Sequence, residues 1–278
     1  MTAPMDAHSL AMLEDSLRKT MLSVSGAELD AALADMGWAE MLSDMPDVTI
    51  PLVFRLLGET GSHASILNDV VLQSSRRPLG GIPALPYAGG IQVILERPPV
   101  DQAAEWILED STELHALGGL PLRRVDEGDL LRLAEARRAL GWWMVGSSRA
   151  MLALARQHAL DRVQFGKPVA AFQAVRHKLA ETLVAIEGAE ATLNLPGSDN
   201  NDLTALLAKA ACGKAALTTA KHCQQVLAGI GFTAEHDLHR HVERVLVLDG
   251  LLGSARELTK KAGSGLRARG SAPRLAQL

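Results

Sequence analysis

The stretch RVQFGKPVAAFQAVRHKLA, residues 162–180, contains two of the four phenylalanines of the chain, one on each side of a Gly-Lys-Pro turn. It reads as a polar helix end, a turn, and a proline-initiated helix that opens with Phe-Gln. Arg162 ends a long helical pattern, where a cation is favourable. A guanidinium at such a corner can bind a diphosphate through two parallel hydrogen bonds, and simple helix capping is the alternative interpretation.

Helical patterns surround this stretch. We expect helices at about 129–161, 169–194, 201–227 and 234–262, with breaks at Pro196-Gly197 and at the glycines before Phe232. Four helices joined by short connections predict an antiparallel four-helix bundle over 129–262. The tail, 263–278, is expected to be exposed and partly mobile.

The preceding part of the chain divides at Arg76. Residues 1–75 show amphipathic patterns at 5–24, 28–38, 50–59 and 62–74, which predict a small N-terminal helical domain. Residues 76–128 are rich in proline and glycine, and only 91–96 and 104–109 read as strands. This middle segment is too short for a core of its own, so we expect a reduced β meander or loops. The fold class is therefore mainly α.

Composition excludes several classes of partner. The net charge is −4, without a basic face that would neutralise nucleic acid. No apolar run is long enough to span a membrane and no signal peptide is recognisable, so we expect a cytoplasmic protein.

Cys212 and Cys223 are expected to be buried thiols. Lys209, Lys214 and Lys221 are expected on a solvated helix face.

Three segments together resemble the C-terminal domain of the acyl-CoA dehydrogenase family. They are ALDRVQFG (159–166), FQAV (172–175) followed by His177 and Leu179-Ala180, and QVLAGIGFTAE (225–235). The resemblance implies the cofactor FAD. It assigns the diphosphate to Arg162 and Gln164, and the adenosine side to Phe165 and Gln173. It also implies that Gln225 and Gly229 contact the flavin nucleotide of a neighbouring subunit.

The sequence departs from the family at three places. The middle segment lacks the family's Thr-Glu-Pro-Gly-x-Gly-Ser type loop and its Trp-containing strand, which together hold the flavin ring. Where many members have a catalytic Glu in Glu-Gly-Thr, this chain has Leu252-Gly253-Ser254, and leucine cannot take a proton. The first glycine of the family's Gly-Gly pair is Ala228.

Two carboxylates are candidates for the missing base. Some members place the base on the first bundle helix, which corresponds to Ala136, with Glu135 beside it. Asp249 is expected one helical turn before Leu252 on the same face. For both, a solvated carboxylate is the alternative interpretation. The histidines at 236, 239 and 241 have helical spacing, but the resemblance explains this segment and we expect no metal.

The resemblance implies α,β-dehydrogenation of an acyl-CoA thioester, with electrons passed to an acceptor such as electron-transfer flavoprotein. Because a base and a ring-binding loop are missing, the chain looks like the short subunit of a heteromeric α2β2 enzyme with a full-length acyl-CoA dehydrogenase partner. Such bacterial enzymes degrade steroid side chains and rings, so a steroid-derived acyl-CoA is one expectation. The alternatives are a self-sufficient homomeric dehydrogenase and a non-catalytic scaffold or regulator.

Overall fold

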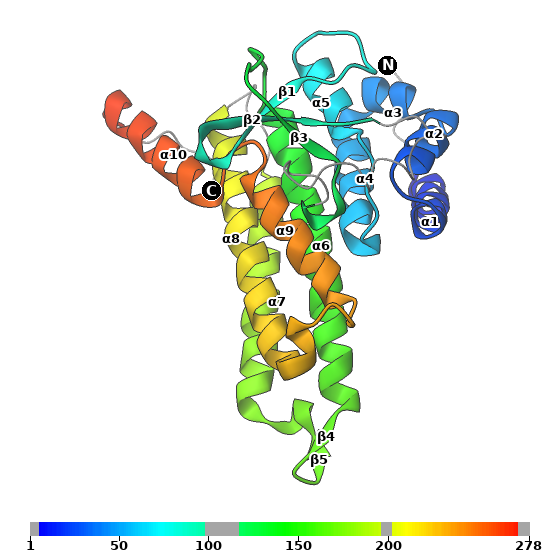
Figure 1. Ribbon diagram of the computed structural model, residues 1–278, viewed down its shortest axis with the longest axis vertical. Coiled ribbons are helices and arrows are strands. Elements are labelled where there is room, and N and C mark those ends of the chain that lie inside the picture. Colours follow the sequence, from blue (N-terminus) through cyan, green and yellow to red (C-terminus); the bar gives the residue numbers. More distant parts are fainter. Residues whose placement is uncertain (1–5, 98–116, 196–201, 272–278) are drawn as a thin grey trace.

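The structure is a computed structural model that describes residues 6–97, 117–195 and 202–271. Figure 1 shows an elongated helical bundle with a group of shorter helices beside its upper half and a small sheet across its top. The mainly α fold class is thus confirmed. Within the described ranges, no helix is both long and apolar enough to cross a membrane.

Five helices form the N-terminal group: α1 (Ala7–Ser23), α2 (Ala27–Asp35), α3 (Trp38–Asp44), α4 (Pro46–Thr60) and α5 (Leu67–Ser74). The sequence patterns did not predict α3, and they placed the start of α4 at residue 50. Pro46 begins α4, since the first helical position needs no backbone N–H donor.

Helix α4 packs directly on the bundle through two glycines. A Cβ atom at Gly58 would lie 2.2 Å from the Trp143 carbonyl oxygen, and one at Gly146 would lie 2.0 Å from the Arg55 carbonyl oxygen. No side chain fits at either position, so the backbones of α4 and the first bundle helix touch. The edge of the Phe54 ring meets Trp143 beside this contact, with centroids 5.9 Å apart.

The middle segment forms a three-stranded antiparallel meander in the order β1 (Ala84–Tyr87), β2 (Ile91–Leu95) and β3 (Leu122–Val125). The predicted strand at 91–96 is confirmed as β2, whereas β1 and β3 were not predicted. Both are four residues long and β1 contains a proline, so neither shows a strand pattern. The predicted strand at 104–109 lies outside the described residues.

The bundle consists of α6 (Ala134–Asp161), α7 (Gln173–Leu193), α8 (Asp202–Leu227) and α9 (Leu238–Gly250). The predicted fourth helix is not continuous, because the backbone leaves the helix at Leu251 and restarts as α10 (Ala255–Arg269). A capping box starts α10: Ser254 and Glu257 each bond the other's backbone N–H. Helix α10 therefore extends through the first part of the predicted tail.

The interior confirms the two cysteines as buried thiols but corrects one lysine. Cys212 and Cys223 are free and buried. Lys214 and Lys221 are exposed as expected, whereas Lys209 is fully buried. The expectation for Lys209 was wrong because helical spacing places a residue on a face but does not say what covers that face.

Buried Arg244 of α9 joins the three parts of the chain. Its Nη1 donates to the Ser62 carbonyl 3.0 Å away, and its Nε donates to the Gly118 carbonyl. The guanidinium carbon lies 5.7 Å from the Trp143 ring centroid of α6. Burial lowers the pKa of Arg244 to about 10, so the side chain remains charged at neutral pH.

We predict that Arg244→Met lowers the free energy of unfolding by about 3 kcal/mol, because it leaves two buried carbonyl groups without their donors. The measurement is urea unfolding followed by circular dichroism. Arg240→Met is the matched control, since Arg240 is exposed and its loss should change stability by less than about 0.5 kcal/mol. Equal effects of the two substitutions would contradict this role.

Candidate cofactor and substrate site

A two-residue hairpin forms the lower tip of the bundle in Figure 1. It consists of β4 (Val163–Gln164) and β5 (Lys167–Pro168), joined by Phe165 and Gly166. Both turn residues have positive φ, 54° and 77°, as a type I′ turn requires. Positive φ is unusual for a bulky residue, and it leaves Phe165 92% exposed.

The hairpin presents aromatic and cationic groups together. The rings of Phe165 and Phe172 meet edge to face with centroids 6.2 Å apart. The Lys167 ammonium lies 4.5 Å from the Phe172 centroid. Arg162, the C-cap of α6, is exposed at the base of the hairpin. The tip therefore offers ring faces for stacking and cations for an anion.

The other predicted cofactor residues are exposed near the same end of the bundle. Gln164 lies in β4, and Gln173 begins α7 with its amide nitrogen 3.3 Å from His177 Nε2. Gln225 lies in the last turn of α8, and Gly229 lies in the 3-10 helix η5 (Ala228–Phe232). Figure 1 shows η5 toward the end of the bundle that carries the hairpin. The structure thus places Arg162, Gln164, Phe165 and Gln173 at or beside the hairpin, whereas Gln225 and Gly229 lie at the end of α8 and in η5.

Ala228 adopts a conformation that favours glycine. Its φ is 56°, and it occupies the position where the sequence resemblance places the first glycine of a pair. An alanine in the left-handed region costs about 1 kcal/mol relative to glycine. Gly231 is needed for close packing against the end of α8, because a Cβ there would lie 2.7 Å from the Gln224 carbonyl oxygen.

Two buried cations hold the turn between α9 and α10. The Lys209 ammonium donates to the carbonyl oxygens of Asp249 and Gly253, at 2.6 and 2.5 Å. Arg137 Nε lies 3.4 Å from the Leu252 carbonyl oxygen, and Leu252 has a φ of 59°. The sequence did not predict that Arg137 and Lys209 support this turn. The only signal for either residue was a cation within an otherwise apolar helical pattern.

The sheet also contacts this turn. The Leu252 N–H donates to the Pro86 carbonyl at 2.7 Å. A Cβ at Gly250 would lie 2.4 Å from the Tyr87 ring, so only glycine fits there. Leu252 itself is buried among apolar side chains. The turn is therefore fixed by the bundle on one side and by β1 on the other.

The two candidate bases occupy different surroundings. Asp249 Oδ1 accepts from the Ala255 N–H at 3.0 Å and lies against Gly213, so it caps α10. Because α9 ends at Gly250, the prediction that Asp249 and Leu252 share a helical face is wrong. Glu135 is half-buried in the first turn of α6. Burial raises the pKa of Glu135, with a smaller opposing effect of Arg138.

A pocket of about 440 Å³ opens beside the Arg137 end of this turn. Its lining combines apolar groups with three cations and one carboxylate: Leu131, Arg132, Leu133, Ala134, Arg137, Asp202 and Lys261. Arg137 Nη1 lies 2.5 Å from Asp202 Oδ1, while Arg132 and Lys261 are exposed. The pocket can accept a ligand that has both apolar and anionic parts.

Two of the three histidines have structural partners. His236 Nδ1 accepts from the Leu238 N–H, and His239 lies 3.0 Å from Glu243. His241 is buried, and burial lowers its pKa to about 4. Among the residues that the structure describes, no group of His, Cys, Asp or Glu has the arrangement of a metal site.

Comparison with known proteins identifies the bundle. Residues 129–258 match the acyl-CoA dehydrogenase C-terminal domain. The match covers just under half of the chain, which over its bundle is therefore similar to the acyl-CoA dehydrogenase family. Acyl-CoA dehydrogenase FadE34 of Mycobacterium tuberculosis is 38% identical over 135 residues, which are 45% of this chain and 19% of FadE34. The matched segment is thus about a fifth of that relative.

Two solved structures extend the likeness to almost the whole chain. The ChsE4-ChsE5 complex of Mycobacterium tuberculosis aligns with a TM-score of 0.68 and 17% identity, over 98% of this chain and 99% of that one. The Tcur3481-Tcur3483 steroid ACAD aligns with a TM-score of 0.63 and 18% identity, over 95% and 98%. At these identities the likeness establishes the fold of the chain.

We predict that Ala228→Gly raises the free energy of unfolding by about 0.5–1 kcal/mol, because glycine adopts positive φ without a steric penalty. Ala180→Gly in α7 should lower it by about 1 kcal/mol, since Ala180 is exposed within a helix. Urea unfolding of both variants measures the two opposite signs. Destabilisation by both would show that Ala228 is not strained.

We predict a pH dependence from Lys209. Burial lowers the pKa of Lys209 to about 7, below its unfolded value of about 10.4, so the unfolded chain binds more protons between these values. Stability should then rise from pH 7 towards pH 10 in the wild type relative to Lys209→Met, by up to about 1.4 kcal/mol per pH unit. Urea unfolding at pH 7 and pH 9 measures this difference. Parallel pH profiles would refute the shift.

Proposed function

We propose that this chain is a subunit of an FAD-dependent acyl-CoA dehydrogenase and that its bundle end contributes contacts to the cofactor at a subunit interface. The observation that supports this most directly is the hairpin, which exposes Phe165 beside Arg162 at the tip. For a 92% exposed phenylalanine in a strained backbone conformation, the edge-to-face contact with Phe172 is a small gain. The hairpin fits a ligand that combines an aromatic ring with a diphosphate.

Different residues would contact different parts of the cofactor. Arg162 and Gln164 would hold the diphosphate by charge and amide hydrogen bonds, and Phe165 and Gln173 would hold the adenosine. Gln225 and Gly229 would contact the nucleotide bound by a neighbouring subunit. When bound, FAD accepts the hydride that dehydrogenation releases. This chain's own residues would position the cofactor at the tip, supply charge to it and exclude water from it.

The α-proton requires a base from elsewhere, because Leu252 occupies the position of the family's catalytic glutamate in the ungapped alignment. Asp249 is engaged in capping α10, and Glu135 lies in the first turn of α6. We therefore propose a heteromer in which a full-length acyl-CoA dehydrogenase partner supplies the base and the ring-binding loop. Solved neighbours named as a complex of two proteins favour this arrangement.

The pocket beside Arg137 is the proposed contact for acyl-CoA. Exposed Arg132 and Lys261 suit the phosphates of the CoA group, and Leu131 and Leu133 suit its apolar parts. A steroid-derived acyl group is the proposed substrate class, since one solved neighbour is named a steroid ACAD. Electron-transfer flavoprotein is the proposed electron acceptor. Turnover of steroid-CoA and of straight-chain acyl-CoA by the purified complex separates these substrate classes.

We predict that Arg162→Ala weakens FAD binding to the complex by about 10- to 100-fold, because a hydrogen bond to a charged group contributes about 1.5–3 kcal/mol. The chain is co-expressed with its partner, and bound flavin is measured by absorbance and by titration with FAD. Arg156→Ala is the control, because Arg156 is exposed on α6 before the hairpin. Unchanged flavin content in Arg162→Ala would favour the scaffold alternative.

The homomeric alternative is tested with the chain alone. If the purified chain binds FAD and oxidises acyl-CoA without a partner, the heteromeric proposal is wrong. Glu135→Gln and Asp249→Asn would then identify the base by loss of turnover with flavin still bound.

A further inference from the structure

The pocket beside Arg137 contains an ion pair whose two partners differ in exposure. Arg137 Nη1 lies 2.5 Å from Asp202 Oδ1, and 5% of the Arg137 side chain is exposed against 58% of the Asp202 side chain. The Leu252 carbonyl oxygen, 3.4 Å from Arg137 Nε, holds the same guanidinium from inside the protein. Arg137 is therefore a fixed, buried cation, whereas its carboxylate partner lies mostly in solvent.

A solvent-exposed partner can be exchanged for another anion. A buried charge is stable only when it is paired, but the pairing group can come from a ligand as well as from the chain. Asp202 is the first residue of α8, where the helix dipole makes a carboxylate favourable even without a nearby cation. Asp202 would therefore keep a favourable position after another anion replaced it on Arg137.

The pocket carries an excess of positive charge. Its lining residues include three cations, Arg132, Arg137 and Lys261, and one carboxylate, Asp202. Arg132 and Lys261 are exposed, so a ligand can reach them from solvent. A phosphate ester brings about two negative charges and several acceptor oxygens, and a guanidinium can bind it through two parallel hydrogen bonds. The ligand chemistry that fits this pocket is therefore a phosphate group.

We propose that Asp202 is an internal competitor in a phosphate-binding subsite, and that a phosphate group of the ligand replaces its carboxylate on Arg137. Arg137 binds the phosphate at the buried end of the subsite, and Arg132 and Lys261 bind it from the exposed side. This inference rests on the proposed acyl-CoA contact of the same pocket. It adds that the chain's own carboxylate lowers the affinity of that contact.

The test measures binding of inorganic pyrophosphate and of CoA to the full chain by isothermal titration calorimetry. Pyrophosphate carries only the phosphate chemistry, whereas CoA adds the pantetheine and adenosine parts. Asp202→Asn should bind pyrophosphate about tenfold more tightly than the wild type, because no carboxylate then competes for Arg137. Asp202→Glu, which keeps a carboxylate at this position, should bind like the wild type.

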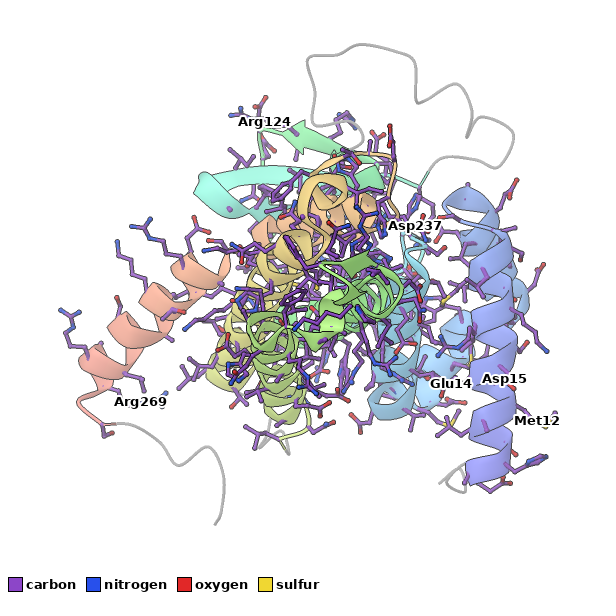
Figure 2. All side chains as sticks on the ribbon, turned by 90° about the horizontal axis from the view of Figure 1, so that it is seen from below. Met12, Glu14, Asp15, Arg124, Asp237 and Arg269 are labelled. Atoms are coloured by element: carbon purple, nitrogen blue, oxygen red, sulfur yellow. The ribbon has the colours of Figure 1, made fainter. Side chains whose placement is uncertain are left out.

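Two further variants locate the effect. Asp15→Asn removes the same charge from an exposed position on α1, which Figure 2 shows on the opposite side of the molecule from α10, the helix that carries Lys261. Its pyrophosphate affinity should equal that of the wild type. Arg132→Met/Lys261→Met changes two exposed residues of the pocket and should weaken pyrophosphate binding by about tenfold or more.

Arg137→Gln tests whether the competition takes place on Arg137. Glutamine keeps an N–H donor for the turn but removes the charge, and circular dichroism checks that the chain is folded. In this background Asp202→Asn should change the pyrophosphate affinity by less than about twofold. A gain that persisted would come from the general charge of the pocket and would refute the competition. The Asp202 variants, which change an exposed residue, keep the inference testable if Arg137→Gln does not fold.

The two ligands separate this inference from the proposed CoA contact. Equal pyrophosphate affinities of the wild type and Asp202→Asn would overturn the inference. If Asp202→Asn binds pyrophosphate more tightly but neither protein binds CoA more tightly than pyrophosphate, the subsite stands and the CoA contact is wrong. If both proteins bind CoA with the same affinity and pyrophosphate with the same affinity, the CoA contact stands and the competition by Asp202 is wrong.

Discussion

Arg244 is the contact on which the arrangement of the three parts depends. One guanidinium bonds the Ser62 carbonyl of the N-terminal group and the Gly118 carbonyl of the middle segment, and it faces Trp143 of the bundle. A buried cation is tolerated only when donors and acceptors match, so this group fixes the relative positions of all three. Gly118 lies shortly before β3, and the sheet itself packs on the common core through Leu85, Val93, Leu95 and Leu122.

The same principle recurs at the turn between α9 and α10. Lys209 and Arg137 bind three carbonyl oxygens of residues 249–253, and the Pro86 carbonyl of β1 binds the Leu252 N–H. This support keeps a leucine in a left-handed conformation. Two elements thus hold this turn, at which the sequence resemblance expects a catalytic base and this chain has Leu252. Ordering of the turn and the chemistry of its side chain are separate properties.

The geometry at one end of the bundle depends on local sequence, and the geometry at the other end depends on residues that are distant in the chain. At the hairpin, local residue types determine the geometry: Gly166 permits a type I′ turn, and the turn exposes Phe165. For that reason a turn could be predicted from the sequence, whereas the cofactor roles of Arg162 and Phe165 stay predictions that rest on the family resemblance. At the α9–α10 turn, the participating residues come from α6, α8, α9 and β1, so no local pattern predicts the cluster. Asp249 was placed on a face with Leu252 because the helical pattern was continued through Gly250 and Gly253, the two glycines that flank the helix break.

The sequence by itself determined the helical class, the bundle, the strand β2 and the family motifs, because these depend on periodicity and on short runs of residues. The tertiary structure alone decided that Lys209 is buried, that Arg244 joins three segments, and that α10 continues beyond residue 262 with half its length unpacked. Burial depends on what covers a face, and that is a property of contacts between distant parts of the chain.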